Sequence, residues 1–409
     1  MKPEIIALNG YYTLIAATIV LLIGRLLVQR IKFFQNFNIP EPVAGGLLAA
    51  FILSIVYSTT GHSFAIEKPL QDAFMLIFFA SIGLSADFSR LKQGGMPLVI
   101  FLVIVSVFIV IQNLVGVGMA SAMGQNPLFG LITGSITLTG GHGTGAAYGK
   151  ILTERYGIAN ATDIAMIAAT YGLVSGGLIG GPVARRLVNK MGRKPVEQTV
   201  EVDSKGSYDN QTFESAGHQR LITATSAIET MAMFAACLAF SSIMIKTFPD
   251  FKLPQFVWAL GFGVVLRNVL TTVFKFDMFD RAIDVFGNAS LSLFLAMALM
   301  SMKLWQLADM AGPMLAILAV QTVVMIFYAY WVTARFMGND YDAAVLAAGH
   351  CGFGLGATPT AVANMQSITN TFGSSHKAFL IVPLVGAFFI DLVNMAILDR
   401  MMAWFGTAL

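Results

Sequence analysis

Charged residues are scarce in this chain of 409 residues: they make up 11% of it, whereas hydrophobic residues make up 56%. Soluble domains carry about 25% charged residues, so a soluble globular protein is excluded. A helical crossing of about 30 Å of hydrocarbon needs roughly 20 apolar residues, so ten crossings would use on the order of 200 residues. The mean hydropathy of +0.73 fits that demand. We therefore predict a polytopic protein that lies in a lipid bilayer.

Cysteine, net charge and the motifs of common enzymes are also nearly absent. Cys237 and Cys351 are the two cysteines, and both lie in apolar stretches, which excludes a disulfide framework. A formal charge of +3 is too small to indicate a nucleic-acid partner. The chain has no His-Glu-x-x-His, and residues 143–150 lack the spacing and the final Ser/Thr of a nucleotide-binding loop. We expect a protein that is not an enzyme and that uses no cofactor.

Uncharged intervals locate the membrane spans, because a Lys or Asp at the bilayer centre costs about 2.5–3.5 kcal/mol on insertion scales. The polar segment 191–219 interrupts the hydrophobic pattern and is predicted to be a solvated linker. The intervals that we interpret as single helical spans are residues 5–24, 42–66, 73–86, 164–184, 221–245, 253–266, 285–302, 310–334 and 378–398.

One further interval, residues 93–149, is longer than a span. Its 57 residues contain no Asp, Glu, Lys or Arg, which is too long for one crossing and too short for three crossings with their turns. Its second part holds the run Gly140-Gly-His-Gly-Thr-Gly-Ala-Ala147, a poor sequence for a helix interior. One span followed by a re-entrant hairpin at residues 127–150 fits better, and the glycine-rich segment 343–365 predicts a second hairpin.

The two halves of the chain are related to each other. Gly141-x-Gly143-x-Gly145-Ala146-Ala147 aligns with Gly352-x-Gly354-x-Gly356-Ala357-Thr358 at an offset of 211 residues. The halves, residues 1–190 and 220–409, are each predicted to contain five transmembrane helices and one re-entrant hairpin. An odd number of crossings turns the second half upside down relative to the first. The predicted fold is an all-α membrane protein, an inverted repeat with ten transmembrane helices in total.

The positions of the basic residues predict the orientation. With the N-terminus outside, seventeen Lys and Arg residues lie on the cytoplasmic side and eight on the other. The positive-inside rule therefore favours outer positions for both termini. The first hairpin then enters the membrane from outside, and the second enters from the cytoplasm.

The two hairpins are the predicted binding site. Irregular backbone at membrane depth occurs where protein or a water-filled cavity satisfies its polar groups. Helix N-termini attract carboxylates, and unwound carbonyls coordinate cations, so we expect an anionic solute and a small cation together. The candidate substrate-binding residues are Thr137, Thr139, Gly141, His142, Gly143, Thr144, Gly145, Gly352, Gly354, Gly356 and Thr358.

Several of these residues have ordinary structural interpretations as well. A helix hydroxyl often bonds its own i−4 carbonyl, and His142 and His350 are each as compatible with a satisfied neutral imidazole as with a ligand. The pattern Gly177-x-x-x-Gly181 is typical of close helix packing, and we assign it no transport role.

Ionisable residues inside spans are the candidate cation ligands, since such residues are costly in a membrane. Asp391 interrupts an apolar last span, and Asn394 at i+3 places a second oxygen on the same helical face. Glu229, in the middle of the sixth span, is predicted to bind the cation or to pair with an arginine.

Four long motifs resemble the bacterial sodium/glutamate symporter family, and the resemblance extends over nearly the whole chain. The motifs are Ile39-Pro-Glu-Pro-Val-Ala-Gly-Gly46, Ser135-Ile-Thr-Leu-Thr-Gly-Gly-His-Gly-Thr-Gly145, Gly287-Asn-Ala-Ser-Leu-Ser-Leu-Phe-Leu-Ala-Met-Ala-Leu-Met300 and Ala347-Ala-Gly-His-Cys-Gly-Phe-Gly-Leu-Gly-Ala-Thr-Pro359. The resemblance implies L-glutamate import coupled to Na⁺, a bacterial inner-membrane location with periplasmic termini, and a homodimer. It also implies an elevator mechanism, in which the hairpin-bearing parts slide past a scaffold.

Two other functions remain open from the residues alone. A passive anion channel also uses re-entrant loops but needs no alternation between states, and a related dicarboxylate is an alternative solute. Liposome counterflow separates the channel from the symporter, because channel uptake persists without a Na⁺ gradient.

Overall fold

In the first half, the described residues form seven longer helical elements and one short helix. The computed structural model describes residues 4–36, 39–192, 222–248, 253–302 and 310–406. Most of the predicted linker lies outside the described residues. The elements are α1 (Gly10–Arg30), α2 (Lys32–Asn36), α3 (Glu41–Thr60), α4 (Lys68–Ser85), α5 (Phe88–Ala122), α6 (Pro127–Leu131) running into the π-helical η1 (Ile132–Ile136), α7 (Gly141–Tyr156) and α8 (Ala161–Lys190).

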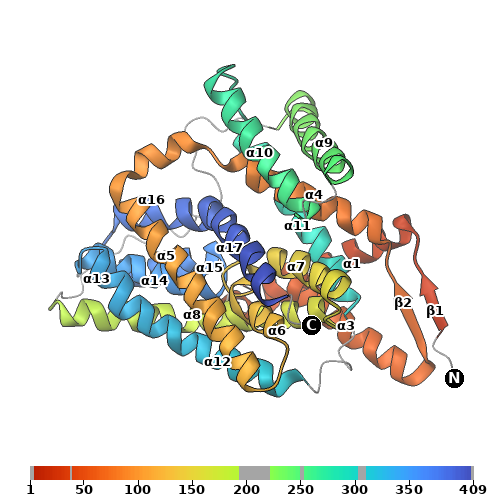
Figure 1. Cartoon of the computed structure of the whole chain (residues 1–409), viewed down its shortest axis with the longest axis horizontal. Helices are drawn as coiled ribbons and strands as arrows, with labels where there is room; N and C mark the ends of the chain where they lie inside the picture. The colour runs from red at the N-terminus through yellow and green to blue at the C-terminus, as the bar shows by residue number, and fades with distance from the viewer. Residues whose placement is uncertain (1–3, 37–38, 193–221, 249–252, 303–309, 407–409) are drawn as a thin grey trace.

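The second half repeats this order of long helices, a hairpin and a final long helix (Figure 1). Its last helix contains a π-helical segment. The elements are α9 (Ala224–Thr247), α10 (Gln255–Thr272), α11 (Asp280–Met300), α12 (Ala311–Phe327) with η4 (Tyr328–Thr333) and α13 (Ala334–Phe336), α14 (Tyr341–Leu355), α15 (Thr358–Phe372), and α16 (His376–Leu384) with η5 (Val385–Phe389) and α17 (Ile390–Phe405).

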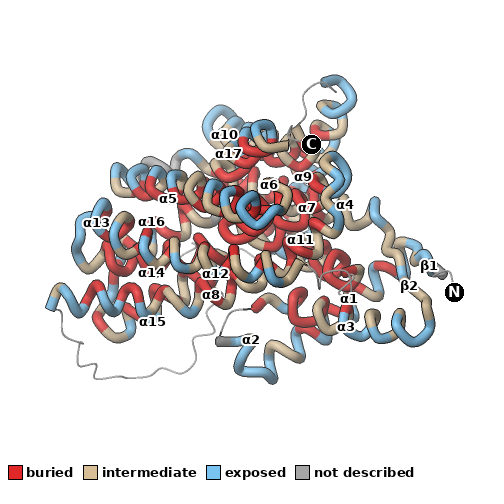
Figure 2. The backbone as a smooth tube through the Cα atoms, turned by 60° about the horizontal axis from the view of Figure 1, so that its bottom comes forward, coloured by how far each residue is buried: buried red, intermediate tan, exposed pale blue. Residues whose placement is uncertain are grey.

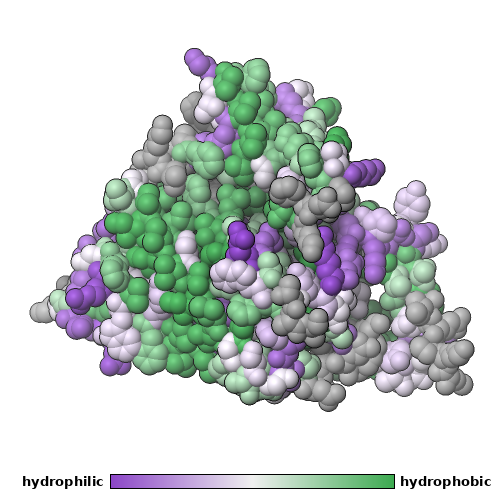
Figure 3. All heavy atoms as spheres, viewed as in Figure 1, coloured by the Kyte–Doolittle hydropathy of each residue, from purple (hydrophilic) through white to green (hydrophobic). Residues whose placement is uncertain are grey.

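Seven of the described helices are long and apolar enough to cross a membrane. Their surfaces are inverted relative to a soluble protein: in α1, Ile15, Leu22 and Leu26 are exposed while the small residues Thr13 and Ala17 are fully buried. Figure 3 shows broad apolar surface on the side of the molecule that it draws, and Figure 2 shows how the exposed residues follow the outer helix faces. The chain is an integral membrane protein built from helices, as predicted.

The prediction that residues 5–24 form one helix is wrong at its first residues, and the helix predicted within residues 42–66 ends at Thr60, before a strand. Residues Glu4–Ala7 form β1, which pairs in parallel with β2 (His62–Ala65). The side chain of Asn9 accepts a hydrogen bond from the Tyr12 amide at 3.0 Å, which caps α1 and starts the helix after the strand. Hydropathy alone does not separate an apolar strand from an apolar helix end, so the uncharged interval gave no signal of this sheet.

The helices gather into two groups, and each group takes elements from both halves. We call α1, α3, α4, α9, α10 and α11 the scaffold bundle, and α5–α8 with α12–α17 the core bundle. Within the scaffold bundle α4 packs on α10 and α11, and α3 packs on α1 and α11; within the core bundle α8 packs on α7, α14 and α15. The main contacts between the bundles join α11 to α7 and α8, and α4 to η5. In Figure 1, α9 and α10 lie at the top of the view and α8 and α12 at the bottom.

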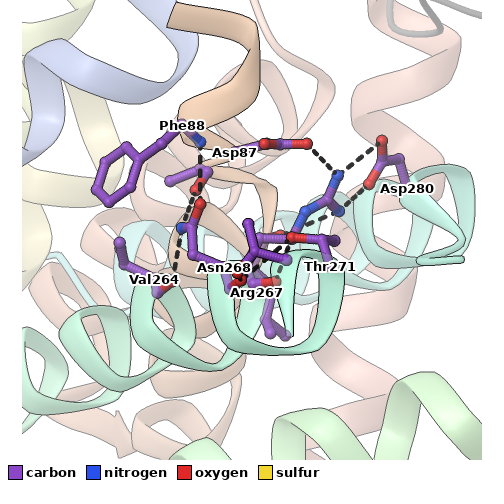
Figure 4. Close-up of polar contacts among 10 residues, drawn as sticks. Asp87, Phe88, Val264, Arg267, Asn268, Thr271 and Asp280 are labelled. Atoms are coloured by element: carbon purple, nitrogen blue, oxygen red, sulfur yellow. Dashed lines mark hydrogen bonds and ion pairs between the residues drawn. The ribbon is translucent and has the colours of Figure 1, made fainter. Parts of the chain in front are cut away.

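An ion-pair cluster fixes the start of α5 to the scaffold bundle (Figure 4). The side chain of Arg267 on α10 is 4% exposed; its Nη2 lies 3.2 Å from Asp87 Oδ2, and Nη1 pairs with Asp280. The neighbouring Asn268 accepts a hydrogen bond from the Phe88 amide at 3.1 Å. A few residues later the backbone of Gly95 leaves the helical region, with φ 57° and ψ −158°. The first turns of α5 therefore stay with the scaffold, and the break at Gly95 separates them from the rest of the helix.

Candidate functional site

The predicted first hairpin consists of two helical arms with an irregular connection. Its first arm, α6 with η1, is interrupted at Gly134 (φ −106°, ψ −136°), and α7 begins the second arm at Gly141. The second predicted hairpin has the same plan: α14 ends at Leu355, α15 begins at Thr358, and the two residues between them are not helical. Both segments therefore supply the free helix ends that the glycine content predicted.

The breaks of the two hairpins lie against each other. Gly141 has a φ of +65°, and a Cβ built on it would lie 3.5 Å from the carbonyl oxygen of Gly356. A side chain at Gly141 would both strain the backbone and reach the second hairpin. The structure thus brings together two segments from different halves of the chain.

Buried amide side chains from two long helices bridge the breaks. Gln112 of α5 donates from Nε2 to the Gly354 carbonyl at 3.0 Å and accepts at Oε1 from the Thr139 hydroxyl at 2.8 Å. Gln321 of α12 donates from Nε2 to the Gln112 backbone carbonyl at 2.7 Å. Both glutamines are fully buried. Because buried polar groups are costly without partners, these bonds hold α5, α12 and both hairpins in one arrangement.

A second set of hydrogen bonds fixes the break in the first hairpin to the last helix. The Ser135 amide donates to Asn113 Oδ1 at 3.0 Å, and Asn113 Nδ2 donates to the Ser135 hydroxyl at 2.8 Å. That hydroxyl donates to Asn394 Oδ1 at 2.7 Å, while Asn394 Nδ2 donates to the Ser135 carbonyl at 3.1 Å. We call Gln112, Asn113, Ser135, Thr139, Gln321, Gly354 and Asn394 together the hairpin junction.

Some buried oxygen atoms near these elements have no partner. Among the described residues, Gln321 Oε1 and Thr360 Oγ1 make no hydrogen bond. In the same part of the chain, no three His, Cys, Asp or Glu side chains lie together as a metal site. Oxygen atoms of amides, hydroxyls and backbone carbonyls are therefore the ligands that the junction offers to a hard cation, which prefers oxygen.

The other predicted substrate residues have structural partners. The Thr137 hydroxyl donates to the Ile132 carbonyl at 2.6 Å, and His142 Nε2 lies 3.0 Å from the Thr170 hydroxyl. The contact of His142 matches the satisfied imidazole that the sequence left open, whereas Thr137 donates to the i−5 carbonyl and not to the i−4 carbonyl. A Cβ at Gly143 would lie 2.6 Å from Phe78 on α4, so this glycine faces the scaffold bundle.

The remaining predicted residues line contacts inside the core bundle. Thr144 packs against Gly140 of the same hairpin, and a Cβ on Gly145 would contact Thr137. Gly352 faces the backbone of Ala361, and the Thr358 hydroxyl lies next to Gly386. Of the predicted substrate residues, the structure therefore places Thr139 and Gly354 in the hairpin junction, and Gly141 and Gly356 beside it.

The three predicted cation ligands lie in different places. Asn394 is 1% exposed and belongs to the hairpin junction. Asp391, one turn earlier on α17, is half-buried and hydrogen-bonds no described residue. Glu229 is exposed on α9, a scaffold helix that packs mainly on α4 and α10. Asn394 thus lies among the amides of the hairpin junction, whereas Glu229 lies apart on a scaffold helix.

Sequence reasoning missed Gln112, Asn113, Ser135 and Gln321 as residues of the site. A signal was present, because an adjacent Gln-Asn pair stands in the long uncharged interval and Gln321 stands in an otherwise largely apolar span. Polar residues in membrane helices usually face the protein interior. These side chains are neutral, so the criterion of ionisable residues did not include them.

Comparison with known proteins gives a consistent result along the chain. A family model described as sodium/glutamate symporter matches residues 6–374. A Haemophilus influenzae protein named sodium/glutamate symporter is 52% identical over 392 residues, which cover 95% of this chain and 96% of the relative. The Escherichia coli K12 protein of the same name is 54% identical over 393 residues, with coverage of 95% and 96%.

Among solved structures, a sodium proton antiporter from Methanocaldococcus jannaschii aligns over 97% of this chain and 98% of its own. The identity is 12% and the TM-score 0.43, which is below the level at which a shared fold is inferred.

Proposed function

Because the chain belongs to the sodium/glutamate symporter family, it is a sodium-coupled glutamate transporter and not an enzyme, and we propose that Na⁺ and L-glutamate share a site at the hairpin junction. One observation carries this proposal. The Gly354 carbonyl of the second hairpin accepts hydrogen bonds from Gln112, at 3.0 Å, and from Thr139 of the first hairpin, at 3.3 Å. The irregular segments of both halves thus meet at one buried point.

The helix ends at this point suit two ligands of opposite charge. Gly354 lies in the last turn of α14, where carbonyl groups form the negative end of the helix dipole. The first turns of α7 and α15, at Gly141 and Thr358, present backbone N–H groups, which favour carboxylates. In the proposed mechanism, Na⁺ takes carbonyl and amide oxygens and glutamate takes the N–H groups. Each ligand then favours binding of the other, as coupling requires.

We assign the negative charge near the Na⁺ ligands to Asp391. It lies three residues before Asn394 on α17, so the two side chains are neighbours on one helical face. An unpaired carboxylate in a membrane helix is costly, and a bound cation offsets that cost. Glu229 has no part in the proposed site.

The proposed transport movement is of the elevator type. The core bundle contains the whole hairpin junction, and its main contacts to the scaffold bundle are confined to α11 and α4. Corresponding elements of the two halves exchange partners: α4 packs on α10 and α11 on α3, while α5 packs on α17 and α12 on α8. This reciprocity supports an inverted repeat of ten transmembrane helices with two re-entrant hairpins.

The orientation and assembly belong to the same proposal. The surplus of basic residues on one side supports periplasmic N- and C-termini in the inner membrane. The family resemblance supports a homodimer, with the scaffold bundle as the part that stays fixed in the bilayer.

Purified protein in proteoliposomes tests the shared site. With an inward Na⁺ gradient, we expect uptake of L-glutamate in preference to a panel of amino and dicarboxylic acids. The Asp391→Asn variant should need severalfold more Na⁺ for half-maximal uptake. Glu229→Gln, a matched loss of one carboxylate on an exposed helix face, should behave as wild type. Equal Na⁺ dependence in Asp391→Asn and wild type would remove Asp391 from the site.

A further inference from the structure

A cavity of about 310 Å³ lies in the core bundle between α8 and α15, outside the hairpin junction. Its lining residues are Gly177, Gly181, Pro182, Arg185, Ala363, Asn364 and Ser367. The two helices pack on each other, and the backbone tube of Figure 2 shows them near each other. Its volume is at the lower end of the range of about 300–1,000 Å³ that small-molecule sites occupy.

The glycines on α8 have two separate roles, close helix packing and lining of the cavity. Gly176 and Gly180 make the close contacts, since a Cβ on Gly180 would lie 2.1 Å from Asn364 Nδ2. A Cβ on Gly181 would meet no atom within 4 Å, because this residue faces the open space. The pattern Gly177-x-x-x-Gly181 therefore lines the cavity, and the packing role that the sequence assigned to it belongs to Gly176 and Gly180.

The polar groups on the cavity wall suit a carboxylate-bearing solute. Arg185 is exposed, and no described residue forms an ion pair with its guanidinium. Asn364 is 5% exposed; its Nδ2 donates to the Gly176 and Ala348 carbonyls at 2.9 and 3.3 Å, while its Oδ1 bonds no described residue. An arginine fork binds a carboxylate through two parallel hydrogen bonds, and the amide oxygen of Asn364 is an acceptor for an ammonium group.

The cavity is connected in sequence and space to the second hairpin. Asn364 stands six residues along α15 from Thr358, a distance of about 9 Å at the helical rise of 1.5 Å per residue. Arg185 lies near the end of α8, at the predicted cytoplasmic side of the membrane. The cavity thus extends from that membrane face toward the break in the second hairpin.

We propose that this cavity is a cytoplasmic vestibule in which Arg185, Ser367 and Asn364 bind the solute, an amino dicarboxylate, before it leaves the protein. The inference rests on the proposed function and its orientation. It adds a second site to the one at the hairpin junction. Its specific consequence is asymmetry: groups in the vestibule act on glutamate presented from the cytoplasm and not on glutamate presented from outside.

Right-side-out and inverted membrane vesicles test this asymmetry. The Na⁺-driven glutamate KM is measured from each side for Arg185→Gln and for Arg186→Gln, a neighbouring exposed arginine that does not line the cavity. Loss of a charge-assisted hydrogen bond predicts a rise of about tenfold in the cytoplasmic-side KM of Arg185→Gln. The outer-side KM of that variant and both values for Arg186→Gln should stay within about twofold of wild type, a change worth less than RT in binding free energy.

A second variant fills the cavity without removing charge. Gly181→Leu projects a side chain into the open space, so the protein should fold and show the same one-sided defect. The vestibule is overturned if neither variant changes the cytoplasmic-side KM, if Arg186→Gln matches Arg185→Gln, or if both sides change equally. Failure of the wild type to take up glutamate on a Na⁺ gradient is a different result, and would contradict the proposed function itself.

Discussion

The backbone and hydroxyl of Ser135 join two membrane helices to the break in the first hairpin. Its amide is free because Gly134 leaves the helical conformation, and Asn113 accepts from that amide. The hydroxyl accepts from Asn113 Nδ2 and donates to Asn394 Oδ1, so both of these amide atoms have a hydrogen-bond partner. A fully satisfied polar network in a low-dielectric interior is rigid, which is what a selective ion site needs.

Replacing this hydroxyl should destabilise the protein. Ser135→Ala leaves buried groups of Asn113 and Asn394 without a partner, at a cost of about 1–3 kcal/mol. Ser106→Ala on the same helix as Asn113 is the control, since its hydroxyl donates only to the Leu102 carbonyl of its own helix, at 2.6 Å. Thermal unfolding in detergent should show a lower Tm for Ser135→Ala. Equal Tm values for the two variants would mean that the network contributes no stability.

Adding one methyl group at Gly354 should weaken Na⁺ binding without unfolding the chain. A Cβ there would lie 3.1 Å from the flexible Met325 thioether and 3.3 Å from His350, so the backbone can shift slightly to accept it. That shift moves the carbonyl to which Gln112 and Thr139 donate. Uptake by Gly354→Ala should require severalfold more Na⁺, while Gly118→Ala, whose Cβ would meet nothing within 4 Å, should match wild type. A normal Na⁺ requirement in Gly354→Ala contradicts the role of this carbonyl.

The residues of the site were predictable in part. Glycine content identified Gly141, Gly354 and Gly356. Asn394 was identified because it places a second oxygen on the helical face of Asp391. Gln112 and Gln321 were missed because their role depends on which helices pack around the hairpins, and a single sequence does not contain that packing. His142 and Thr137 were included because they lie in or beside the glycine-rich segment, although each has a hydrogen-bond partner within the protein.

At the scale of elements, the junction between α4 and α5 connects the two bundles. Arg267 and Asn268 of α10 hold Ala86, Asp87 and Phe88 on the scaffold side. The helix break at Gly95 then lets the rest of α5 take its own direction in the core bundle. In the proposed mechanism, this fixed segment and the glycine break after it form the hinge about which the core bundle moves.

Neutralising Arg267 should loosen this junction. Arg267→Gln removes the buried guanidinium that pairs with the carboxylates of Asp87 and Asp280, at a cost on the order of 3 kcal/mol. Arg281→Gln is the matched control, because the Arg281 side chain is partly exposed and forms no ion pair within the described chain. The expected result is a lower detergent Tm for Arg267→Gln, with partial recovery in the Arg267→Gln/Asp280→Asn double variant. A Tm equal to that of Arg281→Gln would show that the cluster is not stabilising.

The helical elements were largely predictable, and their ends were not. Uncharged intervals located the long helices because charge is so costly in hydrocarbon. The same criterion extended the first two spans into β1 and β2, whose residues are apolar but extended. The division of residues 93–149 into α5 and a hairpin followed from the length of the interval, which exceeds one span and falls short of three, and from the glycine-rich run in its second part.

At the scale of the whole molecule, the proposed mechanism requires the two bundles to move relative to each other at their contact. Lys150 of α7 and Asp72 of α4 form an ion pair of 2.6 Å across that contact. In the proposed mechanism this pair must separate when the core bundle slides.

A reversible cross-link at this position should stop transport. Asp72→Cys combined with Lys150→Cys should lose uptake on oxidation and regain it with a reductant. The control pair, Asp342→Cys with Ser375→Cys, replaces two core-bundle residues in contact at 2.7 Å, and its oxidation should leave uptake unchanged. Full uptake with the first pair completely cross-linked would contradict the elevator movement.

The most direct test of the account is the side of the membrane from which each hairpin enters. Glu154 at the end of α7 and Ser374 after α15 are both exposed, while the native Cys237 and Cys351 are buried. With a membrane-impermeant thiol reagent, Glu154→Cys should react in intact spheroplasts, and Ser374→Cys should react in inverted vesicles alone. Labelling of both variants from one and the same side would show that the two halves are not antiparallel, and the shared site built from opposing hairpins would be wrong.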